Sequence, residues 1–185
     1  GDGSTSVVFR AEHLAGPGEY AVKALCKRFF LSSEETLVRA EQEAQTAIDL
    51  GDKYPKSFPK VKRIIRDVGE VVQIVMELLQ GRTLRDLLKE GVLLPFSEVV
   101  DIAVKIARAL QCMNYSDRVA NDLKPANVFL CAEGEVKIID FGLVKSILGL
   151  GTLINNIPGC HLPGHHRQVV VIQSCLPTLL ISVLI

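Results

Sequence analysis

The sequence has no excess of either charge sign: 21 Lys and Arg residues balance 21 Asp and Glu residues, so the formal net charge is zero. Without a net charge, bulk electrostatic attraction to nucleic acid is not expected. The five cysteines are odd in number and scattered, which argues against a disulfide framework and for a reducing, cytoplasmic compartment. The first residues, Gly1-Asp2-Gly3, include no apolar leader, so no signal peptide is predicted.

Charge is nearly absent from the last part of the chain. Of the 42 charged residues, 41 lie in 1–145, and Arg167 is the one charge in 146–185. A soluble surface normally carries charge, so this segment differs in kind from what precedes it. Its apolar end, 169–185, is marginal in length for a membrane anchor and is interrupted by Pro177. We expect a domain over 1–145, followed by a divergent apolar tail over 146–185 that is not part of its fold, and no membrane partner.

Hydrophobic periodicity before the tail predicts a strand-rich first part and a helical second part. In the first part, a helix is expected from a capping box at Ser32 and Glu35 to a stop at Gly51. In the second part, Thr83 is expected to cap a short helix that runs through Leu88, and Ser97 to open a longer one. One face of the longer helix is expected to be apolar, with Val99, Ile102, Ala103, Ile106, Leu110 and Met113. The expected strands are 7–10, 20–24, 61–65, 71–77, 128–130 and 136–139.

Two features of the first part suggest phosphate binding. Glycines in the segment Gly1-Asp2-Gly3-Ser4-Thr5-Ser6 would let backbone amides approach phosphate oxygens, although a Gly/Ser-rich hairpin turn explains them as well. Lys23 lies within an apolar strand, and a buried lysine needs an anionic partner, which Glu43 could supply from the following helix. The competing interpretation is a lysine on the solvated face of an edge strand.

The second part carries a more specific constellation. Asp122 could accept a hydroxyl proton, Lys124 could meet a transferring phosphate, and Asn127 could hold a metal ion. Asp140 follows the apolar segment 136–139 and precedes Phe141-Gly142, so it could chelate Mg²⁺ that bridges phosphates. Each alone could be a polar turn, but all of them in this order and spacing indicate phosphoryl transfer.

With these motifs, residues 1–145 resemble a eukaryotic-type protein kinase domain of the serine/threonine branch. The segment Asp122-Leu123-Lys124-Pro125-Ala126-Asn127 is similar to the family's catalytic loop, and Asp140-Phe141-Gly142 to its metal-binding motif. The resemblance implies an α+β, two-lobe fold, ATP and Mg²⁺ as cofactors, and a protein Ser or Thr hydroxyl as acceptor. It also implies an adenine site made of Val8, Ala21, Met76 as gatekeeper, backbone groups from Glu77 to Leu79, and Phe129, with Gly1, Gly3 and Ser6 over the phosphates.

The chain also departs from the family pattern. Asn121 replaces the arginine that normally engages a phosphorylated activation loop, so control by such phosphorylation is not expected. No substrate-binding helical lobe is recognisable after Lys145, so we expect a kinase fold that is incomplete and a chain with little turnover by itself. The alternative is a non-catalytic nucleotide-binding pseudokinase or scaffold. Retention of Lys23, Asp122 and Asp140 favours the enzyme.

Overall fold

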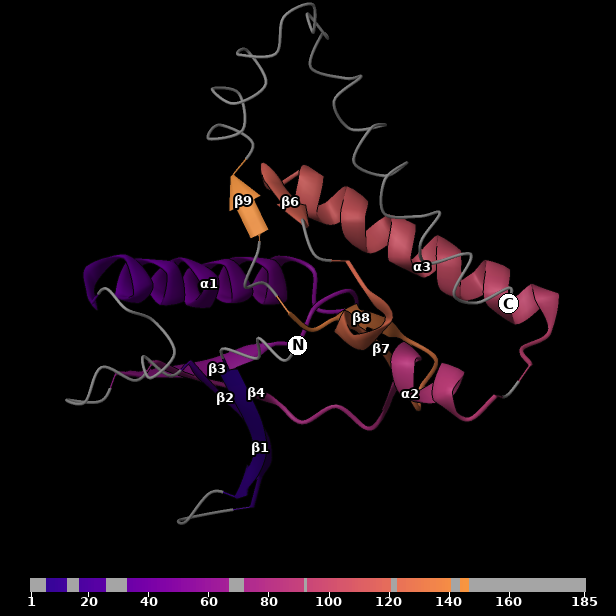
Figure 1. Ribbon diagram of the computed structural model, residues 1–185, viewed down its shortest axis with the longest axis horizontal. Helices are drawn as coiled ribbons and strands as arrows, with labels where there is room; N and C mark the ends of the chain where they lie inside the picture. The colour runs from indigo at the N-terminus through magenta and orange to yellow at the C-terminus, as the bar shows by residue number, and fades with distance from the viewer. Residues whose placement is uncertain are drawn as a thin grey trace, which may run out of the picture. The chain divides into compact units, whose positions relative to one another are not determined.

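The computed structural model describes residues 6–12, 17–25, 33–66, 72–91, 93–120, 123–140 and 144–146 (Figure 1). These residues belong to two compact units, the first within 1–55 and 59–80, and the second within 56–58 and 81–185. The first unit combines an antiparallel sheet with one long helix, and the second combines helices with short strands. The expected α+β class is therefore confirmed.

The sheet of the first unit contains four strands. They are β1 (Ser6–Glu12), β2 (Glu19–Leu25), β3 (Val61–Arg66) and β4 (Val72–Glu77), in the order β1-β2-β4-β3 with antiparallel neighbours. All four strands predicted in this part are confirmed, with ends shifted by a few residues. In β4 the buried Val72, Ile74 and Met76 alternate with partly exposed residues, which is the period of a strand with one face in a core.

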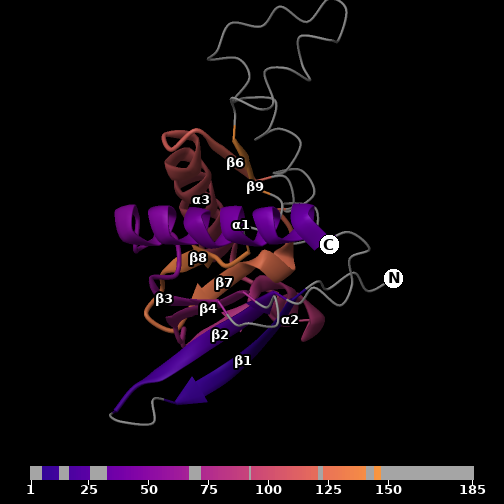
Figure 2. The same ribbon diagram turned by 90° about the vertical axis from the view of Figure 1, so that its left-hand side faces the viewer.

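Helix α1 (Ser33–Lys53) packs on this sheet, and Figure 2 shows it lying along one side of the strands. Ala44 on the helix forms a buried cluster with the β4 residues Val72, Ile74 and Met76. Ala44 and Ala47 are 1% and 2% exposed. Because their side chains are small, the helix axis can come close to the strands.

The predicted helix stop at Gly51 is wrong, because α1 continues to Lys53. Gly51 has a different role: a Cβ added there would lie 2.3 Å from the carbonyl oxygen of Pro59. The glycine thus permits a close approach of the returning chain to the helix. Sequence alone did not separate these roles, since both call for a residue without a side chain. The proposed cap Ser32 lies outside the described residues.

Short strands form the sheets of the second unit. β5 (Gly81–Thr83), β7 (Val128–Cys131) and β8 (Val136–Ile138) pair in that order, and β6 (Arg118–Ala120) pairs with β9 (Val144–Ser146). β7 and β8 confirm the predicted strands 128–130 and 136–139, which flank Gly134 at φ +83°. β5, β6 and β9 were not predicted, because three residues are too few to display an alternation.

Two α-helices are described in the second unit. Thr83 caps α2 (Leu84–Lys89) as predicted, accepting a hydrogen bond from the Asp86 N–H at 3.1 Å. α3 (Phe96–Asn114) begins before Ser97, at the N-cap residue Pro95. The predicted apolar stripe of α3 is confirmed, except that Ala103 is half-buried and Ala109 is buried. The buried residues of α3 are Val99, Ile102, Ile106, Ala109, Leu110 and Met113.

No helix in the part of the chain that the structure describes is both long enough and apolar enough to cross a membrane. The tail predicted over 146–185 lies outside the described residues apart from Ser146, so its proposed boundary stays a prediction. The same holds for the glycines Gly1 and Gly3 and for the proposed base Asp122.

Candidate active site

The nucleotide-site residues predicted in the first unit share one face of its sheet. Lys23 in β2 lies opposite Val8 in β1 and Ile74 in β4. Ala21, two residues before Lys23, lies opposite Met76. Because paired residues and residues two apart point to the same side of a sheet, Val8, Ala21, Lys23 and Met76 belong to one face. Ser6, two residues before Val8, begins β1.

Lys23 and Glu43 form an ion pair on this face. The Lys23 Nζ donates a hydrogen bond to Glu43 Oε1, and the two side chains are 7% and 11% exposed. β2 lies between β1 and β4, so the interpretation of Lys23 as a solvated edge-strand residue is wrong. A buried ammonium group is costly unless an anion compensates its charge, and α1 supplies the Glu43 carboxylate for that purpose. The pair fixes a cation on the same face as Val8, Ala21 and Met76.

The predicted adenine-binding backbone from Glu77 to Leu79 begins at the last residue of β4. Met76 is 9% exposed, and Glu77 is the last residue of the strand. Glu77 and Lys60 bind each other twice: the Glu77 N–H donates to the Lys60 carbonyl at 3.0 Å, and Glu77 Oε1 accepts from the Lys60 N–H at 2.8 Å. Leu79 is half-buried in the segment after the strand. The backbone of Glu77 is therefore held in place by the segment that contains Lys60, just before β3.

The catalytic-loop residues that are described lie in the second unit. Leu123 is buried, Lys124 is exposed, and Pro125–Asn127 form the single-turn 3-10 helix η2. The Asn127 N–H donates to the Lys124 carbonyl at 2.9 Å and closes this turn. A buried leucine next to an exposed lysine anchors the loop and leaves the cation toward solvent. Asp122 immediately precedes this anchored segment in sequence.

The β7–β8 pairing brings the two proposed metal ligands to neighbouring positions. Val128 pairs with Ile138, and one residue outward the Ile139 N–H donates to the Asn127 carbonyl at 3.0 Å. Asp140 is the next residue along the chain. Asn127 is 6% exposed and Asp140 is half-buried. An amide oxygen and a carboxylate are hard oxygen donors of the kind Mg²⁺ prefers, so the donor set fits this ion.

Phe129, proposed to contact adenine, lies in the middle strand of the β5-β7-β8 sheet. It is half-buried and pairs with Thr83 on β5 and Lys137 on β8. Lys137 is 5% exposed, and its Nζ lies 3.7 Å from Glu135 Oε2. The structure thus brings Lys23 to Glu43 in the first unit, and Asn127 to Asp140 in the second.

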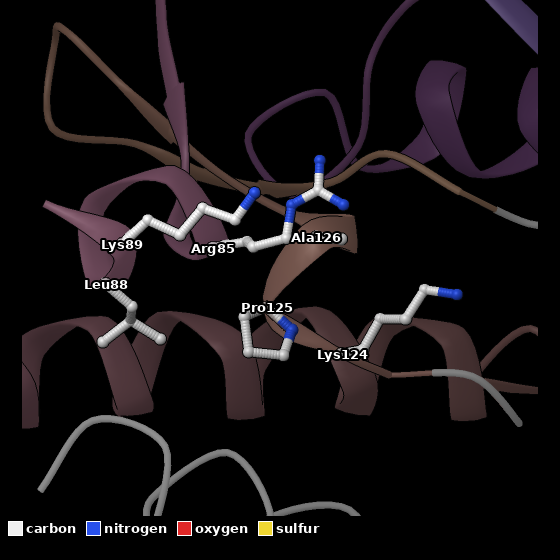
Figure 3. A pocket seen from close by; sticks show the side chains of 6 residues that line it. All are labelled: Arg85, Leu88, Lys89, Lys124, Pro125 and Ala126. Atoms are coloured by element: carbon white, nitrogen blue, oxygen red, sulfur yellow. The ribbon is translucent and has the colours of Figure 1, made fainter. Parts of the chain in front are cut away.

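A pocket of about 460 Å³ lies next to the catalytic loop, between α2 and η2 (Figure 3). Sequence reasoning missed it, although Arg85 and Lys89 are four residues apart and so share a face of α2. The lining residues are Arg85, Leu88, Lys89, Lys124, Pro125 and Ala126.

Asp86, which follows Arg85 in α2, is bound by Thr83. The Thr83 hydroxyl donates to Asp86 Oδ2, and this hydrogen bond, helped by Arg85 and Lys89, lowers the pKa of the Asp86 carboxyl. The next acidic residue, Glu90, is paired with Arg82. Neither carboxylate belongs to the pocket lining.

Comparison with known proteins agrees with this geometry. The model of the protein kinase domain family matches residues 1–156. A probable serine/threonine-protein kinase of Clostridium perfringens is 37% identical over 150 residues, covering 80% of this chain and 21% of the relative. The serine/threonine-protein kinase PknA of Corynebacterium glutamicum is 32% identical over 147 residues, covering 79% and 31%. PknL of Mycobacterium tuberculosis is 31% identical over 145 residues, covering 78% and 35%.

The chain thus spans about a fifth to a third of the length of these curated relatives. The family match extends past residue 145, the end of the domain expected from charge. It covers β1 to β9 and all the proposed site residues. Together with the antiparallel sheet, the buried Lys23–Glu43 pair and the juxtaposed Asn127 and Asp140, this match shows that the chain belongs to the protein kinase family.

Proposed function

We propose that the chain binds Mg-ATP and transfers the γ-phosphate to a Ser or Thr hydroxyl of a protein. The observation that carries the proposal is the buried Lys23–Glu43 pair. A lysine whose side chain is 7% exposed and is held by a carboxylate has little use in the stability of a small sheet, because an apolar pair of similar size would serve as well. It is well suited to bind the α- and β-phosphates of a nucleotide.

The metal site would use Asn127 and Asp140. The hydrogen bond from the Ile139 N–H to the Asn127 carbonyl keeps the backbones of Asn127 and of Asp140, the residue after Ile139, close together without a ligand. Mg²⁺ keeps few protein ligands and takes the rest from phosphate and water, so one amide and one carboxylate suffice. The ion would neutralise charge on the phosphate oxygens during transfer.

The acceptor chemistry would fall to Asp122 and Lys124. Asp122 accepts the proton of the hydroxyl as its oxygen bonds to the γ-phosphorus, while the bond from that phosphorus to the bridging oxygen breaks and ADP leaves. The Lys124 ammonium steadies the transferred phosphoryl group. The Lys124-Pro125 sequence and the names of the relatives support a Ser or Thr acceptor over Tyr.

The rival function, a pseudokinase that only scaffolds, has less support. It would not require a buried lysine–glutamate pair together with an amide and a carboxylate in adjacent register. The named relatives are called kinases. Both functions allow nucleotide binding, so only a measurement of phosphoryl transfer distinguishes the kinase from the pseudokinase.

Thermal denaturation with and without Mg-ATP tests the binding step. A ligand at one hundred times its Kd stabilises the folded state by about 2.7 kcal/mol. We expect a clear upward shift of Tm that requires Mg²⁺ and that Asp140→Asn reduces strongly. Glu133→Gln, which removes an exposed carboxylate from the β7–β8 turn, is the matched control and should keep the shift. Equal shifts for wild type and Asp140→Asn would rule out Asp140 as a metal ligand.

A further inference from the structure

The pocket beside the catalytic loop has a distinctive composition. Three of its six lining side chains are cationic, Arg85, Lys89 and Lys124, and none is acidic. Its apolar residues are Leu88 and Pro125, with Ala126 next to them. In Figure 3 the side chains of Arg85 and Lys89 extend from α2 with their charged ends near each other in this view, and that of Lys124 extends from the loop, apart from them.

Arg85 and Lys89 place two positive charges side by side on α2. Arg85 and Lys89 are four residues apart, so they are neighbours on the same face, where like charges repel. Nearby acids offset this only in part. Arg85 Nε lies 3.8 Å from Asp86 Oδ1, at the limit of an ion pair, while the other oxygen of Asp86 accepts from Thr83 and Glu90 pairs with Arg82. An anion placed in the pocket would relieve the repulsion.

We propose that this pocket docks an acidic segment of the protein substrate, with Asp or Glu side chains close to the phosphorylated Ser or Thr. The inference rests on the proposed function, because Lys124 links the pocket to the transfer site. Lys124 follows Asp122 by two residues, so a chain whose carboxylates contact Arg85 and Lys89 carries its hydroxyl near the catalytic loop. The carboxylates contact the cations, and the aliphatic parts of the segment lie on Leu88 and Pro125.

The charges also define what the pocket disfavours. A substrate with Arg or Lys at these positions would add further positive charge to Arg85, Lys89 and Lys124, and like charges brought together oppose binding. The cations are exposed, so the preference is set by screened interactions and should weaken as salt is added. Specificity here is a difference in affinity between acidic and basic segments.

Fluorescence anisotropy with matched peptides tests this. One peptide carries an acceptor Thr flanked by Glu, a second has Gln in place of Glu, and a third has Lys. We expect the wild-type protein to bind the Glu peptide most tightly, and Arg85→Gln/Lys89→Gln to bind it roughly three- to tenfold more weakly, as two exposed charge contacts predict. Arg108→Gln, which removes an exposed cation of α3 outside the pocket, is the control and should bind like wild type.

Charge reversal gives a second test that a misfolded variant could not pass. Arg85→Glu/Lys89→Glu should lose the Glu peptide and gain the Lys peptide. Equal binding of the three peptides by wild type, or no change on reversal, would overturn the proposal. Binding only of a phosphorylated peptide would also overturn the assignment to carboxylates. So would a weakened Tm shift with Mg-ATP in Arg85→Gln/Lys89→Gln at unchanged peptide affinity, because the pocket would then bind nucleotide.

The two proposals fail separately. A Mg-ATP shift with no peptide preference leaves the proposed function in place and removes the docking site. A peptide preference that follows Arg85 and Lys89 without any Mg-ATP shift retains the docking surface and contradicts the phosphoryl-transfer function.

Discussion

Replacing Glu43 by Leu should destabilise the protein far more than its position on a helix would suggest. The Lys23 side chain is 7% exposed, so loss of the Glu43 carboxylate leaves an ammonium group in a site with little water. Breaking a buried pair from one side costs about 3–5 kcal/mol. For a chain of this size each kcal/mol lowers Tm by about 2–4 °C, so a fall of roughly 6–20 °C is expected.

The matched control lies two residues away on the same helix. Glu41 pairs with Arg66 at 3.3 Å, but the two side chains are 54% and 66% exposed, so Glu41→Leu should cost about 1 kcal/mol or less. The double variant Lys23→Met/Glu43→Leu removes both buried charges and should be more stable than Glu43→Leu alone. Chemical denaturation of all variants gives the comparison. If Glu43→Leu were no more costly than Glu41→Leu, or if the double variant were no more stable than Glu43→Leu, the buried-pair reasoning would be refuted.

Three further predictions concern backbone and caps. Gly81 has φ +140°, and an added Cβ would lie 2.0 Å from the Leu130 carbonyl oxygen, so Gly81→Ala should lower the free energy of unfolding by about 1–3 kcal/mol in urea denaturation, and more than Gly134→Ala, whose Cβ meets nothing within 4 Å. Gly51→Ala should also destabilise the first unit, because Pro59 O is 2.3 Å from the new Cβ; a Tm equal to wild type would contradict the close approach. Thr83→Ala should cost about 0.5–2 kcal/mol through loss of the α2 cap. Since Thr83 lowers the pKa of the Asp86 carboxyl, the part of its benefit that depends on the ionised carboxylate is present above the ordinary Asp pKa of about 3.9 and is lost as pH falls through the lower folded value. The stability difference between wild type and Thr83→Ala should therefore narrow in acid, while the part due to the bond from the Asp86 N–H to Thr83 remains.

Much of the fold could be predicted because its periodicities are long. The apolar stripe of α3 and the strands β1 to β4 extend over enough residues to be recognised, and the structure confirms them. β5, β6 and β9 have three residues each, and their existence depends on pairing with partners distant in sequence. The role of Gly51 could not be predicted either, because a glycine is needed there only by the Pro59 carbonyl, which comes close to it only in the folded chain.

Part of the candidate site could be predicted from the sequence, and part depends on the fold. Sequence spacing suggested a Lys23–Glu43 pair, and the β2 and α1 geometry places the two side chains in contact. The adjacency of Asn127 and Asp140 depends on the β7–β8 register, which the residue types alone do not give. No sequence motif marks the cationic pocket, because it forms only where the fold brings Arg85 and Lys89 of α2 beside Lys124.

The central claim is that these residues perform phosphoryl transfer, and one measurement tests it most directly. The intact protein is incubated with ATP labelled at the γ-phosphate, Mg²⁺ and a Thr-containing acidic peptide, next to an Asp122→Asn variant that binds Mg-ATP normally. We predict slow labelling of the Thr of the peptide with wild type, in keeping with the little turnover expected of this chain by itself, and a loss of at least a hundredfold in that rate with Asp122→Asn, because the proton acceptor is missing. Equal transfer by the two proteins, or none by wild type that binds Mg-ATP, would contradict the proposed function.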